Sequence, residues 1–397
     1  MDLIKILPYT MENKILKEQL LVVAPSFLDE LGHFEYINEI SDGLAEQFEV
    51  KVLCQNYSPS SLRKKVSENI QLIEMDFNTL NLGDSLNTKI FLKNIPFFKN
   101  LLHGFFKILF NVKIHKFVKD STYQKVLYLE AEPLSFLLFS YQAKKIIMTL
   151  HAVDFNRNHS GLRKIYKVLL GCLLPKISKK LSFFAVHTRS AEKRIIKNGI
   201  KAHKVFVSGW GAKLSSIDYK ERTSERINCL SFGVIRKTKR IRELIKAFLH
   251  ANDSRLNLKV VGKIIDEDIN ELQALISNSE SKTIISIEDR FVDSEEFPEI
   301  FTTSDLVILS HEKSFQSISG PLFNAVEFNK PILCFSYNDT KELVEENNLG
   351  IVHELEDMEG VDLYKLCEKA EAGYVPNSMQ FFLWKNIVKR IVSQLRK

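Results

Sequence analysis

The segment Ser319-Gly320-Pro321 combines residue types that favour the start of a helix with residue types that can bind an anion there. It lies between two apolar runs of buried-strand length, DLVIL at 305–309 and PILCF at 331–335. Proline at the first helical position gives up an amide hydrogen that would have no partner in any case. The remaining free amides and the serine hydroxyl can hold an anion together. Because this helix would begin at the carboxyl edge of a parallel sheet, the pattern predicts a diphosphate site.

A second group of candidate ligands lies in the turn after the apolar run 227–233. Gly233 ends this run, and the basic loop that follows contains Arg236 and Lys239. Apolar residues then recur at helical spacing over 241–248. The order strand, basic loop and helix predicts that the two cations point at phosphate groups. A basic loop that only faces solvent is the alternative.

A histidine and an aspartate follow a strand-like run in the N-terminal half. The run KKIIMTL at 144–150 is followed by His151 and Asp154. Both would lie at the carboxyl edge of a sheet, where open α/β sheets keep their sites. A structural histidine and a solvated aspartate are the alternatives. Gly32 and His33 occupy the corresponding turn after the first apolar run, QLLVVAP.

The elements that would position these residues alternate between strand-like runs and amphipathic helices along the whole chain. This alternation predicts a doubly wound α/β fold. A length of 397 residues favours two domains. Residues 1–212 carry 30 Lys and Arg against 19 Asp and Glu, whereas the remainder is acidic. We therefore expect one domain over 1–212 and a second over 213–380, with an amphipathic helix at 381–397 that packs back on the first.

The basic character is strongest in the segment from Thr88 to Lys119. It holds seven lysines and no acidic residue, with phenylalanines and leucines between them. One interpretation is an amphipathic helix pair with solvated lysines. The other is a surface that lies on an anionic membrane, with aromatic side chains in the headgroup layer. No recognition motif for nucleic acid accompanies the charge, so a nucleic-acid partner is not expected.

Cysteine usage and hydropathy point to a cytoplasmic protein. No run reaches the length of a membrane span, and the first 18 residues lack the apolar core of a secretory signal. The cysteines are scattered without the paired spacing of a metal site, so we expect reduced, mostly buried thiols and no bound metal. They are Cys54, Cys172, Cys229, Cys334 and Cys367.

With these residues in view, the chain resembles the GT-B glycosyltransferases, in particular the large family 4 type of bacterial sugar transferases. The segment GVIRKTKRIRELIKAF at 233–248 is similar to the family pattern around its donor-binding lysine. The segment at 302–333 is similar to the family region that carries a pair of glutamates, and TLHAVDF at 149–155 to its strand-end histidine. The resemblance implies two Rossmann-like doubly wound domains that face each other across a cleft.

The chain departs from this pattern at the glutamate pair. Gln316 and Asn324 stand at the two glutamate positions, and Glu327 lies one helical turn further on. The Ser319-Gly320 pair is closer to a divergent subgroup of polysaccharide-assembly transferases. In that subgroup the serine, the glycine and the helix amides would hold the phosphates.

The resemblance also implies roles for individual residues. Lys239 would bind the donor diphosphate, the nucleoside would lie near Arg290 and Phe291, and Glu342 would lie on the sugar side. The full implied donor site is Gly233, Arg236, Lys239, Arg290, Phe291, Ser319, Gly320, Pro321, Asn324 and Glu342.

On the acceptor side the resemblance implies Gly32 and His33, with His151 close to the donor sugar. His151, Asp154 and Lys239 are the candidate catalytic residues. A retaining transfer needs no base on the opposite face. An inverting transfer needs a carboxylate to deprotonate the acceptor, for which Asp154 and Asp29 are the candidates.

The implied activity is transfer of a sugar from a UDP- or GDP-linked donor to a lipid-linked or surface-polysaccharide glycan, without metal or other cofactor. The implied location is the cytoplasmic face of the cell membrane, with the protein bound peripherally. Two alternatives stay open. One is a catalytically inactive GT-B subunit that binds a nucleotide or glycan, which the missing glutamates favour. The other is a nucleotide-sugar epimerase of the same fold.

Overall fold

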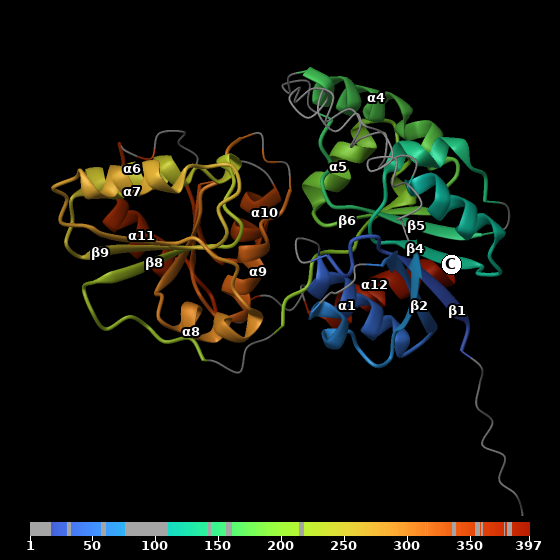
Figure 1. Cartoon of the computed structure of the whole chain (residues 1–397), viewed down its shortest axis with the longest axis horizontal. Coiled ribbons are helices and arrows are strands. Elements are labelled where there is room, and N and C mark those ends of the chain that lie inside the picture. The colour runs from blue at the N-terminus through green and yellow to red at the C-terminus, as the bar shows by residue number, and fades with distance from the viewer. Residues whose placement is uncertain are drawn as a thin grey trace, which may run out of the picture.

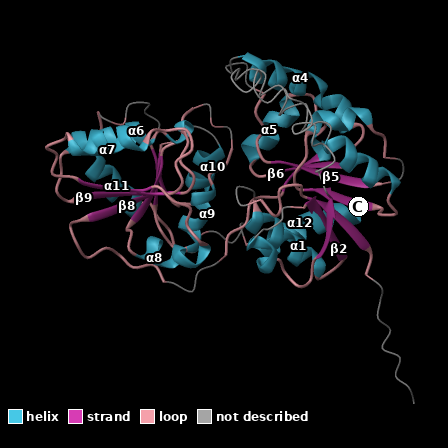
Figure 2. Cartoon of the chain, in the orientation of Figure 1, coloured by secondary structure: helices cyan, strands magenta, loops and turns pink. Residues whose placement is uncertain are grey.

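The chain forms two α/β units, each built on its own parallel sheet between two layers of helices (Figures 1 and 2). The computed structural model describes residues 17–29, 33–56, 61–75, 110–141, 144–155, 161–213, 218–313, 315, 317–335, 339–353, 358, 360–376, 378 and 383–397. The structure confirms the predicted class, with two doubly wound Rossmann-like sheets.

The first sheet has seven parallel strands in the order β3-β2-β1-β4-β5-β6-β7. These strands are β1 Gln19–Val23, β2 Glu49–Gln55, β3 Gln71–Met75, β4 Lys125–Tyr128, β5 Lys145–Leu150, β6 Phe183–Val186 and β7 Val205–Val207. The direction of winding reverses between β1 and β4. A crevice at the carboxyl ends of the strands is expected at such a reversal.

Successive residues of β1 point to opposite faces of this sheet and so divide the first core in two. One face is covered by α1 (Phe34–Ala45) and α12 (Trp384–Arg396). The other is covered by residues 110–120, α4 (Gly161–Ser178) and α5 (Arg189–Lys197).

The second sheet has six parallel strands in the order β10-β9-β8-β11-β12-β13. They are β8 Ile227–Phe232, β9 Leu256–Val261, β10 Ile284–Glu288, β11 Leu306–Leu309, β12 Ile332–Cys334 and β13 Gly350–Val352. The winding reverses between β8 and β11, the two strands that precede the predicted phosphate-binding turns. The helices are α6 Ile241–Ala251, α7 Ile269–Ser277, α8 Phe297–Thr302, α9 Gly320–Glu327, α10 Asp339–Glu346 and α11 Leu363–Ala372.

The last helix, α12, belongs to the first unit although it follows the second in sequence. Its apolar stripe is buried against α1, and its packing is so close that a Cβ added to Gly43 of α1 would lie 2.7 Å from Val388. The Arg390 guanidinium donates to the carbonyl of Ser208 at 2.7 and 3.0 Å. The buried side chains of α12 are Ile387, Val388, Ile391, Val392 and Leu395.

This packing predicts a large loss of stability when an α12 core side chain is truncated. Ile387 is fully buried, so Ile387→Ala is expected to lower the free energy of unfolding by about 2 to 4 kcal/mol. Chemical denaturation measures the change. Lys389→Ala, on the exposed side of the same helix, is the control. Equal stability of the two variants would contradict the docking of α12.

Within the described residues, no helix is long and apolar enough to cross a membrane. All five cysteines are free thiols, and only Cys172, on the outer side of α4, is exposed.

Candidate functional site

The carboxyl edge of the second sheet brings together the two predicted phosphate-binding turns. Gly233 follows β8 with a φ of +91°, a conformation that favours glycine. A Cβ there would lie 3.0 Å from Pro321 and 3.7 Å from the Nζ of Lys239. The turn after β8 and the start of α9 are therefore in direct contact, as their sequence patterns predict.

Lys239 is a buried cation at the centre of this contact. It is 3% exposed and ends a short 3₁₀ turn, Lys237–Lys239. Its Nζ donates to the carbonyl of Phe232 and, at 3.3 Å, to that of Gly233. Burial lowers the pKa of Lys239 to about 7. A lysine held in this way is poised to gain a proton when an anion comes near.

The N-terminus of α9 supplies the second positive element. Ser319 is the N-cap residue, is 3% exposed and makes no capping hydrogen bond through its side chain. Pro321 lies in the first turn, as predicted, and a Cβ built on Gly320 would have nothing within 4 Å. The helix start is thus uncapped and has open space next to it, which suits an incoming anion.

His311 is a residue of this site that the sequence patterns did not bring out. It lies two residues beyond β11, is 5% exposed and stacks on Phe315 with ring centroids 4.2 Å apart. Its Nδ1 has no hydrogen-bond partner among the described residues. Burial, helped by the charge of Lys239, lowers the pKa of His311 to about 3. The available signal was its place just after an apolar run at the reversal point, the same signal that pointed to His151.

The other predicted donor-site residues occupy different surroundings. Arg236 is exposed at the start of the 3₁₀ turn, and Asn324 lies half-buried on α9. The Arg290 guanidinium already pairs with Glu288 and Glu296, and the neighbouring Phe291 is exposed. Gln316 and Gly32 lie outside the described residues.

Glu342 contacts the first unit. Its carboxylate accepts hydrogen bonds from the backbone amides of Arg189 and Ser190, both at 2.7 Å, at the N-terminus of α5. Next to it, the Arg194 guanidinium donates to Asp339 at 2.8 Å. These contacts join α10 to α5 and hold the two units together beside the crevice.

The first unit contributes a cluster of rings to the crevice. The Nε2 of His151 contacts the carbonyl of Leu129 at 2.7 Å, and its Nδ1 contacts the Nε2 of His187 at 3.0 Å. His33, at the start of α1, lies 4.9 Å from His151 between ring centroids. Burial lowers the pKa of all three rings, that of His187 to about 4. His187 was not predicted, although it follows β6 as directly as His151 follows β5.

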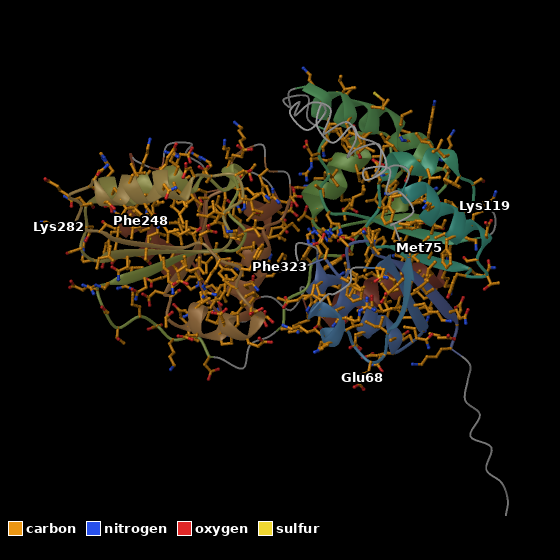
Figure 3. The ribbon with its side chains drawn as sticks, viewed as in Figure 1. Glu68, Met75, Lys119, Phe248, Lys282 and Phe323 are labelled. Atoms are coloured by element: carbon orange, nitrogen blue, oxygen red, sulfur yellow. The ribbon has the colours of Figure 1, made fainter. Side chains whose placement is uncertain are left out.

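Two contacts join this cluster to α9 of the second unit. The hydroxyl of Ser317 donates to the carbonyl of His151 at 3.2 Å. The ring of Trp210 stacks on Phe323 of α9, with centroids 5.9 Å apart. Phe323 lies on the side of the second unit that faces the first (Figure 3). The histidine cluster and the segment that leads into α9 therefore lie side by side where the two units meet.

Asp154 is engaged in an ion pair. Its side chain is 4% exposed, and one carboxylate oxygen lies 3.7 Å from the Nζ of Lys167 on α4. In this structure its carboxylate thus helps to hold α4. Among the described residues, no three His, Cys, Asp or Glu side chains gather as metal ligands.

Comparison with known proteins finds likeness at the level of the fold. No protein-family model matches the chain, and no curated protein sequence matches it. Solved structures match over nearly the whole length.

Three of these structures illustrate the likeness. HepE from Anabaena, in complex with UDP and glucose, is 14% identical with a TM-score of 0.64, covering 96% of this chain and 99% of its own. A glycosyltransferase from Rickettsia africae is 17% identical with a TM-score of 0.65, covering 96% and 98%. Sucrose-phosphate synthase from Thermosynechococcus elongatus is 10% identical with a TM-score of 0.68, also covering 96% and 98%. The likeness shows that this chain has the GT-B fold.

Proposed function

We propose that this protein transfers a sugar from a nucleoside-diphosphate donor to a glycan acceptor. The observation that carries the proposal is the buried site formed by Lys239 and the uncapped start of α9, with the neutral imidazole of His311 beside the lysine. It lies at the winding reversal of the second sheet, and the neighbouring Ser317 and Phe323 contact the first unit. The structures of HepE with UDP and with UDP-glucose support a nucleotide-sugar donor for a chain of this fold.

The chemistry requires the negative charge of the departing diphosphate to be stabilised. Lys239 and the α9 amides would bind the diphosphate on one side, and Arg236 supplies an exposed cation at the mouth of the turn. One such preorganised charged contact is typically worth on the order of 3 kcal/mol in the transition state. Because these groups neutralise the leaving group, we propose that transfer proceeds without a divalent metal.

The experiment that tests the function is transfer and donor hydrolysis by the purified full chain. UDP- and GDP-linked sugars are offered with EDTA present, and free UDP or GDP is measured. Release of the nucleoside diphosphate supports the proposal. No release with any donor, despite measurable UDP or GDP binding, supports a catalytically inactive binding subunit instead. Asn324, at a position where the resembled family has a glutamate, is the observation that favours this second candidate.

For the acceptor, we propose a lipid-linked or surface-polysaccharide glycan reached at the cytoplasmic face of a membrane. The outer stripe of α4 supports this. Ile165 and Leu169 are 64% and 46% exposed, and Lys164 and Lys176 lie exposed on the same helix. Exposed aliphatic side chains among lysines fit an anionic bilayer, where the chains enter the headgroup boundary and the lysines meet lipid phosphates. Figure 1 shows α4 at the outer edge of the first unit.

Replacing both aliphatic residues by acids tests this surface. The double variant Ile165→Glu, Leu169→Glu is expected to lose most of its flotation with vesicles rich in anionic lipid. The change removes the aliphatic side chains that would enter the bilayer, and the two new carboxylates are repelled by the anionic lipids. Val375→Glu, at an exposed position of the second unit, is the matched control and should float like the wild type. Flotation that is unchanged in the double variant would refute docking through α4.

A further inference from the structure

The hydrogen bonds of His151 and His187 cannot all form while both rings are neutral. The Nε2 of His151 lies 2.7 Å from the carbonyl of Leu129, and the Nδ1 of His187 lies 2.8 Å from that of Gly209. A carbonyl accepts only, so each of these nitrogens carries a hydrogen. A neutral imidazole has a single N–H. The two remaining nitrogens face each other at 3.0 Å, and one of them needs an additional proton.

Turning a ring over does not remove the conflict. A half-turn of either ring places a carbon where the nitrogen was and leaves a buried carbonyl without this donor. A lost buried hydrogen bond costs on the order of 1 to 3 kcal/mol. All three hydrogen bonds of this arrangement therefore form only when the couple carries one additional proton, whose positive charge the two rings share.

The surroundings of the couple resist that charge. His187 is 2% exposed, and burial lowers the pKa of both rings. The titratable and charged groups around it come from several elements. They are His33 and Tyr36 at the start of α1, Glu130 after β4, Arg189 and Glu342 beside His187, and Arg390 bound to the neighbouring Ser208 carbonyl. An anion close to the couple would offset the cost of burial.

The couple lies next to the proposed diphosphate site. The carbonyl of His151 accepts from Ser317, two residues before the N-cap residue of α9. Lys239 and the α9 amides approach that site from the second unit. Once protonated, the couple is the matching positive element on the first unit.

We propose that His151 and His187 together take up one proton from solvent when the diphosphate of a nucleotide binds. In this scheme the additional proton lies on the Nδ1 of His151, which becomes a cation. His187 is a positioning residue, because its Nε2 accepts the hydrogen bond from that Nδ1. The proposal rests on the proposed function for the identity of the anion. By reciprocity, whatever UDP adds to the proton affinity of the couple, the proton adds to the affinity for UDP.

Histidine NMR on the full chain, labelled with ¹⁵N in its histidines, tests the proposal. With saturating UDP at neutral pH, both ring nitrogens of His151 should be protonated. UDP affinity should fall by up to about tenfold for each unit by which the pH rises between the midpoint of the couple in the free protein and its midpoint in the UDP complex. A His151 with one protonated nitrogen in the UDP complex at every pH would overturn the proposal.

The variant His187→Gln separates the couple from other titrating groups. The glutamine amide can donate to the neutral Nδ1 of His151, so no additional proton is needed and the UDP-linked protonation of His151 should vanish. His203→Gln, at an exposed position of the same unit, should keep the wild-type behaviour. Protonation of His151 by UDP that persists in His187→Gln would also overturn the inference.

Two further measurements, ligand binding and titration of the ligand-free protein, distinguish failure of this inference from failure of the proposed function. Absence of binding by UDP, GDP and inorganic pyrophosphate would refute the diphosphate site itself. Acid titration of the ligand-free protein, followed by histidine NMR, still measures the protonation of His151 and His187. One shared midpoint, with a single proton taken up by the two rings, supports the couple, whereas two independent midpoints refute it.

Discussion

Lys239→Met is expected to lower kcat/KM for sugar transfer by about two to three orders of magnitude while making the fold more stable. The loss follows from removing one preorganised charge from the proposed diphosphate site. The side chain is buried, and its Nζ lies against two carbonyls and beside Pro321 at the start of α9. Methionine fills nearly the same volume without the charge.

The gain in stability follows from the lowered pKa of Lys239, which is about 7 in the folded chain against an ordinary value of 10.5. The unfolded state therefore binds the proton more tightly than the folded state. Between these two values the stability of the wild type rises with pH, and below pH 7 the full cost of a buried ammonium is present. The variant lacks this cost, so its free energy of unfolding at pH 7 should be higher by on the order of 2 kcal/mol.

Two measurements check the prediction: steady-state transfer kinetics and denaturation at several pH values. Lys237→Ala removes an exposed cation from the same turn and is the control for general charge effects. A variant that transfers sugar at the wild-type rate would remove Lys239 from the donor site. A variant less stable than the wild type at pH 6 would show that the two carbonyl contacts outweigh the buried charge.

Local sequence order was sufficient to predict that the two turns of the proposed diphosphate site lie together. Gly233, Lys239 and the Ser319-Gly320-Pro321 turn each follow an apolar run that reads as a buried strand. Parallel strands place such turns at one edge, and the winding order of the second sheet puts β8 next to β11. The structure accordingly places Gly233, Lys239 and Pro321 in contact.

Contacts between the units could not be predicted in this way. Glu342 caps α5 in the other unit, 152 and 153 positions away along the chain. The spacing of residues around Glu342 carries no information about that partner. His187 was missed for a related reason, since its significance comes from the ring of His151 on the neighbouring strand, and strand neighbours become visible only once the sheet order is known.

Gly262→Ala is expected to disrupt the proposed diphosphate site by displacing the turn after β8. Gly262 follows β9 with a φ of +150°, and a Cβ there would lie 2.2 Å from the carbonyl oxygen of Gly233. That oxygen accepts a hydrogen bond from Lys239 at 3.3 Å. The alanine therefore clashes with the backbone of Gly233, which must move, and this backbone holds the Nζ of Lys239, the lysine of the proposed donor site. We expect a loss of stability of at least about 3 kcal/mol and loss of UDP binding.

Backbone strain and steric clash can be separated with a second glycine. Gly161 also has a positive φ, +59°, but nothing lies within 4 Å of a Cβ built on it. Gly161→Ala therefore reports strain alone and should cost only about 1 to 2 kcal/mol. Thermal unfolding and UDP titration of both variants give the comparison. If Gly262→Ala binds UDP as the wild type does, the turn after β8 does not hold the diphosphate, because the clash displaces that turn first.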